Sequence, residues 1–262
     1  MRWKGQLKKE WILMKTSILA FAMVTFAFIV GGPFILQKVF GVSINYFVGG
    51  VQIGGGWLVL GLFIAIFVLG QSLERDMKQP HIWLHSPASM LELVTVKMVF
   101  VTFVTMVLII WSQLIIVVMF KLSDMAATVS NMDLFQAMAG IFIVIMANSI
   151  TAMAILFFFW AIYQVLKTRT KTFGFILAFL LYVLAAMLWE RLRAFGLFKA
   201  LAKVIPIDLT KPVFFEEVKS SLFLELAADS VMNSVGSIFF YAGLTILLIW
   251  LGAWLLEKKV RL

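Results

Sequence analysis

The sequence predicts an all-α polytopic membrane protein that forms one transmembrane domain over residues 1–262, with six transmembrane helices. Two observations support this prediction. The chain is 63% hydrophobic and only 13% charged, whereas soluble domains are about half apolar and about a quarter charged. The apolar residues also gather in six runs that reach the about 20 residues needed to cross a bilayer. The chain has no cysteine, so disulfides, thiolate metal sites and cysteine nucleophiles are excluded.

Charged residues mark the limits of the six predicted spans. The spans lie near residues 16–36, 51–71, 94–120, 136–163, 172–189 and 235–256. The second run opens with Gly49-Gly50 and Gly54-Gly55-Gly56. Glycine is a poor helix former, which favours a regular helix only from Trp57 onward.

Residues 1–15 predict an amphipathic surface helix before the first span. One helical face carries Trp3, Leu7, Trp11 and Met14, and the lysines of this segment lie on other faces. Ala20-Phe21-Ala22 resembles a signal-peptide cleavage site, but it lies inside an apolar run that continues to Ile35. Because a signal-peptide apolar region is shorter than this, we expect an uncleaved span preceded by a helix that lies flat on the cytoplasmic surface.

The basic residues predict the orientation. Fourteen of them lie in the N-terminal segment, in the loops after spans two and four, and at the C-terminus, whereas the loops after spans one and three carry only Lys38 and Lys121. Short cytoplasmic loops are enriched in lysine and arginine. We therefore expect both termini in the cytoplasm of a bacterial cell, and the net charge of +9 indicates anchoring to anionic lipid rather than binding to nucleic acid.

The segment 190–234 between spans five and six predicts an external hairpin of two amphipathic helices. The apolar faces are Leu192, Phe195, Phe198, Ala202 and Ile205 before Pro206, and Phe214, Val218, Leu222 and Leu226 after Pro212. Such faces are expected to dip into the membrane edge or the protein. A small extracellular cap is an equally weighted alternative.

The loop 72–92 between spans two and three is the densest polar segment. Glu74 and Lys78 are spaced as helical partners, which extends the second helix until Pro80 stops it. Ser89 and Glu92 form a capping-box pattern that begins the next helix, and Ser86-Pro87 is a competing start. The apolar run Ile82-Trp83-Leu84 between these helices suits docking onto a cytosolic partner. The alternative is an ordinary interfacial loop with Trp83 in the aromatic belt.

This arrangement resembles the membrane subunit of type-2 ABC exporters. The stretch from His81 to Lys97 contains Ser86-Pro87, Ser89, Leu93 and Lys97, which is similar to the family's loop leading into span three, and Lys15 and Thr16 loosely match polar residues near the start of span one. The resemblance implies a coupling helix that contacts a separate cytosolic ATPase. It assigns that contact to Glu74, Arg75, His81, Ile82, Trp83, Leu84 and His85. It also implies a second permease copy or a paralogue, with ATP and Mg²⁺ bound by the ATPase and no cofactor bound by this chain.

The remaining chemistry-bearing residues are few. His81 and His85 have the i,i+4 spacing of some zinc sites, but Pro80 and Pro87 flank them, so surface polar contacts are favoured over a metal. All 13 carboxylates are assigned to loops, tails or span boundaries, which argues against a proton-coupled carrier or an intramembrane protease. The polar residues expected inside spans are Ser112, Gln113, Asn148, Ser149 and Thr151. Interhelical hydrogen bonding is favoured for them over a weakly polar substrate path.

These observations favour an exporter permease subunit that moves an amphipathic substrate, with antimicrobial or toxin-like peptides as the leading class. The chain has no Walker A, GxGxxG or GxSxG pattern, so we expect no enzymatic activity of its own and an ATPase on another polypeptide. The alternatives are a non-transporting immunity or sensor protein that binds a peptide, and a small polytopic membrane enzyme. Substrate identity, transport direction and homodimer versus heterodimer stay open.

Overall fold

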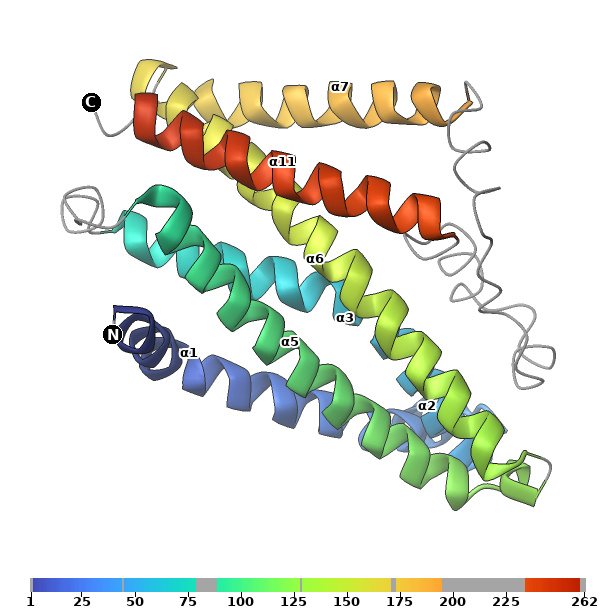
Figure 1. Ribbon diagram of the computed structural model, residues 1–262. Coiled ribbons are helices and arrows are strands. Elements are labelled where there is room, and N and C mark those ends of the chain that lie inside the picture. Colours follow the sequence, from blue (N-terminus) through green and yellow to red (C-terminus); the bar gives the residue numbers. More distant parts are fainter. Residues whose placement is uncertain are drawn as a thin grey trace.

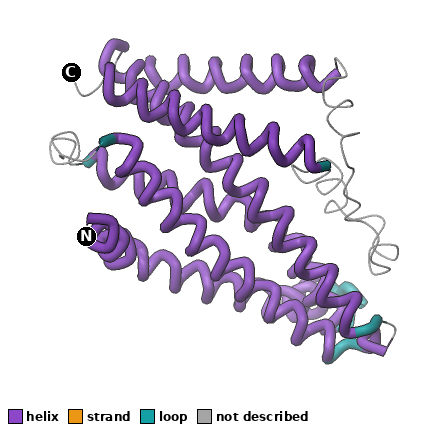
Figure 2. The backbone as a smooth tube through the Cα atoms, in the orientation of Figure 1, coloured by secondary structure: helices purple, strands orange, loops and turns teal. Residues whose placement is uncertain are grey.

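The computed structural model describes residues 2–43, 45–78, 89–127, 129–170, 173–194 and 234–259. Throughout these ranges the chain forms helices joined by short turns (Figures 1 and 2). In chain order the elements are α1 (Arg2–Phe26), the π-helix η1 (Ala27–Gly31), α2 (Gly32–Phe40), α3 (Tyr46–Met77), α5 (Met90–Lys121), the 3-10 helix η2 (Asp124–Ala127), α6 (Asn131–Thr170), α7 (Gly174–Ala194) and α11 (Val235–Lys259).

Six helical segments in these ranges are long and apolar enough to cross a membrane, which confirms the predicted all-α class with six candidate spans. The first combines α1, η1 and α2 into one continuous segment, and the other five are α3, α5, α6, α7 and α11. α6 has 40 residues and is therefore about 60 Å long at about 1.5 Å per residue. The fold is consistent with a multi-pass membrane protein.

The helix ends fall into two groups at opposite ends of the bundle. The N-terminus of α1, the end of α3, the start of α5, the end of α6, the start of α7 and the end of α11 lie on the left of Figure 1. We call this the N-terminal end of the bundle. Both termini therefore lie at the same end, as a six-span path requires. That this end faces the cytoplasm stays a prediction from the basic residues.

The glycine-rich start of the second span is helical, so the expectation of a regular helix only from Trp57 is wrong. α3 begins at Tyr46, with Asn45 as its N-cap: the Asn45 side chain accepts a hydrogen bond from the Phe47 N–H at 3.0 Å. The glycines allow close packing. A Cβ on Gly54 would lie 2.4 Å from Ile116 Cγ1, and one on Gly50 would lie 3.2 Å from Met119 Cγ. Tertiary contact with α5 therefore outweighs the low helix propensity of glycine.

The predicted surface helix and the start of the first span form one α-helix, α1, which ends at Phe26 where the π-helix η1 begins. In Figure 1 the first turns of α1 are seen nearly end-on while the rest runs across the view, so the two parts point in different directions. The predicted apolar face is divided in the structure: Met14 is buried and Leu7 packs against the core, but Trp3 and Trp11 are exposed. The buried face of this segment also includes Glu10. A position on the membrane surface stays a prediction.

The predicted external hairpin lies almost entirely outside the described residues, which omit 195–233. Its first predicted apolar residue, Leu192, belongs to α7, which continues past Glu190 to Ala194. α7 itself packs against α6 along one edge of the bundle (Figure 1).

A buried charge network as the candidate functional site

Four polar side chains from three helices meet in the interior at the N-terminal end of the bundle. They are Glu10 from α1, Ser72 and Asp76 from α3, and Lys97 from α5. The three ionisable side chains are only 5–8% exposed, and Ser72 is 2% exposed. Lys, Glu and Asp are almost never buried to this extent unless they are paired.

Lys97 is the centre of this network. Its Nζ lies 2.6 Å from Glu10 Oε1, 2.9 Å from Asp76 Oδ2 and 2.6 Å from Ser72 Oγ. Ser72 accepts from Lys97 and donates its hydroxyl proton to Glu10 Oε2 at 2.8 Å. Lys97 donates hydrogen bonds to Glu10 Oε1 and Ser72 Oγ, and it forms an ion pair with Asp76 Oδ2. One lysine therefore joins α1, α3 and α5.

The network also balances its charge. Lys9, on the exposed rim, donates to Asp76 Oδ1 at 3.2 Å and has a side chain that is 55% exposed. Lys9 and Lys97 carry two positive charges, and Glu10 and Asp76 carry two negative charges. A buried ion pair is stable only when its geometry is good and further hydrogen bonds satisfy the charged groups. Here Glu10 also accepts from Ser72, and Asp76 also accepts from Lys9.

Helical spacing explains how the sequence places these residues together. Ser72 and Asp76 are four residues apart in α3, so they lie on one face of that helix. Glu10 lies on the same face of α1 as Leu7 and Met14, which contact the apolar core below the charges. Lys97 follows Val94 and precedes Val101 on the buried face of α5.

The start of α5 is held by two further contacts beside the network. Ser89 caps the helix by accepting from the Glu92 N–H at 3.2 Å, which confirms the predicted start of this helix. Glu257, near the end of α11, accepts from the Met90 N–H at 2.8 Å. A carboxylate at a helix N-terminus is stabilised by the unpaired N–H groups there. α11 is therefore connected to α5 at the same end of the bundle.

Only Glu74 and Arg75 of the predicted ATPase contacts are described, and they differ in environment. Glu74 is exposed and forms no ion pair with Lys78. The helix extension that their spacing predicted is confirmed, because α3 continues to Met77 with Lys78 as its C-cap. Arg75 turns to α1, where its Nη1 contacts the Leu13 carbonyl oxygen and lies 3.3 Å from Met14 Sδ. The other predicted contacts, His81, Ile82, Trp83, Leu84 and His85, lie outside the described residues.

The five polar residues predicted inside spans bond mainly to their own helices. Ser112, Asn148 and Thr151 each donate to a carbonyl oxygen four residues earlier. Gln113 makes an interhelical bond, donating from Nε2 to the Met138 carbonyl oxygen at 2.8 Å. Ser149 is fully buried, and its Oγ has no hydrogen-bond partner within the described ranges. A substrate path along these residues stays a prediction.

The assignment of all carboxylates to loops, tails or span boundaries misses the network. Glu10 and Asp76 lie in long helices and are buried, and Lys97 lies two turns inside α5 rather than at its edge. The sequence carries a signal for Lys97: it is the only charged residue between Glu92 and Lys121. Treating each charge as a span limit hides this signal, because that rule assigns Lys97 to the boundary of span three and looks for no partner.

Comparison with known proteins gives no relative: no family model matches the chain, and neither the curated proteins nor the solved structures include a significant match. The fold and the network therefore define the class only as a multi-pass helical membrane protein with an internal ion-pair network.

Proposed function

We propose that this chain is the permease subunit of an ATP-driven exporter and that its charge network transmits the motion of a coupling loop. The observation that carries the proposal is the position of the network. Lys97 joins α1 to the end of α3 and the start of α5, the two helices that flank residues 79–88. A force on that segment would act on three helices together. The hydrogen bond from the Met90 N–H to Glu257 would transmit the force to α11 as well.

The exporter resemblance suggests what the connection between α1, α3 and α5 does. In that interpretation residues 79–88 contact a cytosolic ATPase through Trp83, and nucleotide-driven movement of the ATPase displaces α3 and α5. The network keeps their ends together with α1, so the helices move as a unit. The cargo is an amphipathic molecule, with a peptide as the leading class, because the chain's many Met and Phe residues form adaptable apolar surfaces.

The test is co-purification of the full chain, tagged and solubilised in mild detergent from its native membrane, with an ATPase that carries a Walker A sequence. Buried aromatic anchors commonly contribute about 2 kcal/mol to a protein interface, which corresponds to about thirtyfold in affinity. Trp83→Ala should therefore reduce the ATPase recovered by about that factor at matched expression.

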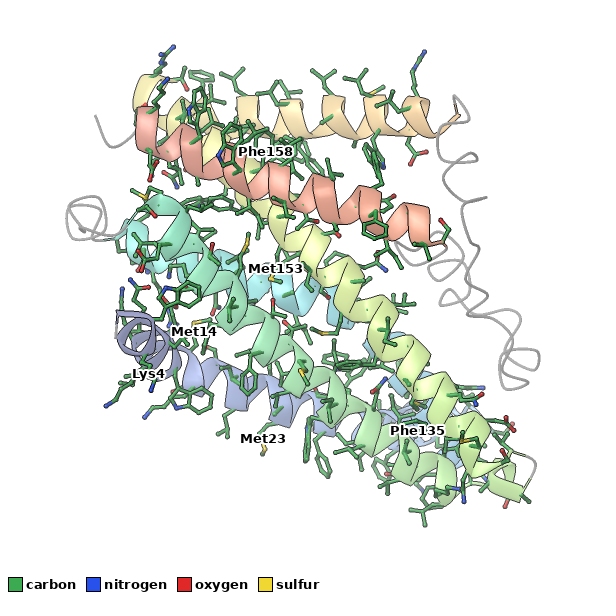
Figure 3. The ribbon with its side chains drawn as sticks, in the orientation of Figure 1. Lys4, Met14, Met23, Phe135, Met153 and Phe158 are labelled. Atoms are coloured by element: carbon green, nitrogen blue, oxygen red, sulfur yellow. The ribbon has the colours of Figure 1, made fainter. Side chains whose placement is uncertain are left out.

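Phe135→Ala is the matched control, because Phe135 is an aromatic residue, 68% exposed, at the opposite end of the bundle (Figure 3). It should leave ATPase recovery unchanged. If the wild type recovers no such ATPase, the exporter proposal fails and a peptide-binding immunity or sensor protein becomes the better interpretation. If Trp83→Ala recovers as much as the wild type, residues 79–88 are not the docking site.

The proposed orientation has a separate test. Because the sequence contains no cysteine, an introduced cysteine is the only thiol that a reagent can label in this chain. Single cysteines at Ser43 and Ala126, at the end opposite the N-terminus, should react with an impermeant thiol reagent added to intact cells. A cysteine at Thr170, where α6 ends, should react only after lysis. If the cysteine at position 170 is labelled in intact cells, the proposed orientation is wrong, and residues 79–88 do not lie in the cytoplasm.

A further inference from the structure

An open groove runs along the outer surface between α1 and α5. Its volume is about 860 Å³. Its lining residues are Trp11, Lys15, Thr16, Ile18, Leu19, Ala22, Met23 and Phe26 of α1 with Val107, Leu108 and Trp111 of α5. None of the five polar residues predicted for a substrate path lines it. Met23 projects from α1 away from the bundle in Figure 3, so this groove opens on the surface that would face lipid.

The groove has a polar end and an apolar body. Lys15 and Thr16 lie toward the N-terminal end of the bundle, and from Ile18 to Phe26 the α1 wall is entirely apolar. The indole N–H of Trp111 is satisfied by the Ala22 carbonyl oxygen at 3.2 Å. From Ile18 to Phe26 the apolar wall extends about 12 Å at about 1.5 Å per residue, which is most of the about 15 Å of half a bilayer's hydrocarbon thickness.

The charge around the polar end is positive. Residues 1–15 contain a single carboxylate, Glu10, and that carboxylate is buried and paired with Lys97. Lys9 pairs with Asp76. By contrast Lys15 is exposed, and no carboxylate in the described ranges lies within ion-pair distance of it. The internal network therefore buries the only carboxylate of residues 1–15 and leaves the exposed Lys15 ammonium group at the polar end of the groove.

We propose that this groove binds an anionic phospholipid. One acyl chain lies against α1 and α5 between Ile18 and Phe26, and the phosphate lies beside the Lys15 ammonium group. Trp11 stands at the same level, where indole rings are favoured at membrane interfaces. The apolar body selects a chain-bearing molecule, and the Lys15 ammonium group selects an anionic headgroup over a zwitterionic one. This proposal is independent of the exporter function.

The experiment measures lipid retained by the purified full chain after exposure to equimolar phosphatidylglycerol and phosphatidylcholine, by native mass spectrometry. The wild type should retain one phosphatidylglycerol molecule in preference to phosphatidylcholine. Lys15→Gln should lower that preference about fivefold, since one basic side chain near a membrane surface contributes about that factor, and Lys15→Arg should preserve it. Lys38→Gln, which removes a lysine at the opposite end of the bundle, should leave it unchanged.

A second variant tests the apolar body without disturbing the core. Leu19 lines the groove and is 68% exposed, so Leu19→Trp should fill the groove and remove the retained lipid of either headgroup. The same change at Leu184, an exposed residue of α7, should not. Glycerol phosphate, which has the anionic group without an acyl chain, should not displace the lipid. The proposal is overturned if the wild type retains no phosphatidylglycerol preferentially, or if Lys15→Gln and Leu19→Trp both match the wild type.

Discussion

α5 and α7 are both apolar helices of one chain, yet their surroundings differ sharply. In its most apolar window 56% of α5 is buried, against 6% for α7. α5 contacts α1, α3, α6 and α11, whereas α7 packs mainly on α6. Both helices satisfy the length and apolarity of a span, so apolarity alone does not separate them.

The difference lies in their polar residues. α5 buries Lys97, Thr105 and Ser112, whereas α7 has no buried polar residue among those described. Lipid chains are as apolar as leucine, so an apolar side chain gains little by leaving lipid for protein. Lysine, aspartate and glutamate side chains, in contrast, are almost never buried without a partner, so Lys97 holds α5 against α1 and α3. Polar contacts and close packing therefore decide which spans form the interior of this protein.

Removing the central charge should have the largest effect. Lys97→Met leaves Glu10 and Asp76 buried near each other without their shared partner, and breaking a buried pair in this way costs about 3–5 kcal/mol. We expect a large loss of stability in thermal unfolding of the detergent-solubilised protein.

A triple variant distinguishes the cost of unpaired buried charge from the cost of the changed side-chain shape in that experiment. Lys97→Met combined with Glu10→Gln and Asp76→Asn removes all the buried charges and should recover much of the loss. If Lys97→Met alone unfolds at the wild-type temperature, the network does not hold α1, α3 and α5 together, and the contrast between α5 and α7 loses its explanation.

Removing the Ser72 hydroxyl group from the network should have an intermediate effect on stability. Ser72→Ala removes a bond from Lys97 and a bond to Glu10, and hydrogen bonds to charged groups contribute about 1.5–3 kcal/mol. Ser112→Ala is the matched control, because Ser112 is also 2% exposed but donates only to its own helix at the Leu108 carbonyl oxygen. Equal losses from the two variants, measured by the same unfolding assay, would show that burial rather than the network sets the cost.

The sequence predicted the six candidate spans of the described residues because hydropathy and charged boundaries act over about 20 residues. It predicted the start of α5 from Ser89 and Glu92, a local pattern that tertiary contacts did not override. It failed at Gly50 and Gly54, where helix propensity was outweighed by contact with Ile116 and Met119.

The network could not be derived from the sequence for a different reason. Glu10, Ser72 and Lys97 are far apart in the chain, and each has an ordinary local explanation as an interfacial or loop residue. Only the packing of α1 against α3 and α5 brings them within hydrogen-bond distance. A charged residue inside an apolar run, such as Lys97, is the one local sign that such a partner exists.

The smallest loss of stability is expected from a substitution in α7, and this substitution tests whether lipid or protein covers that helix. Leu184 is 55% exposed, and its surroundings in a membrane are lipid chains, so Leu184→Ala should change the stability by less than about 0.5 kcal/mol. Leu108→Ala in α5 is the matched comparison: Leu108 is 2% exposed, and buried Leu→Ala changes cost about 2–5 kcal/mol. Unfolding of both variants in the same detergent gives the two values directly.

A loss of stability at Leu184 as large as that at Leu108 would mean that α7 packs against protein rather than lipid. The described residues leave most of the surface of α7 uncovered. An unfolding temperature that rises with protein concentration in the wild type but not in Leu184→Ala would identify the protein packed there as a second subunit.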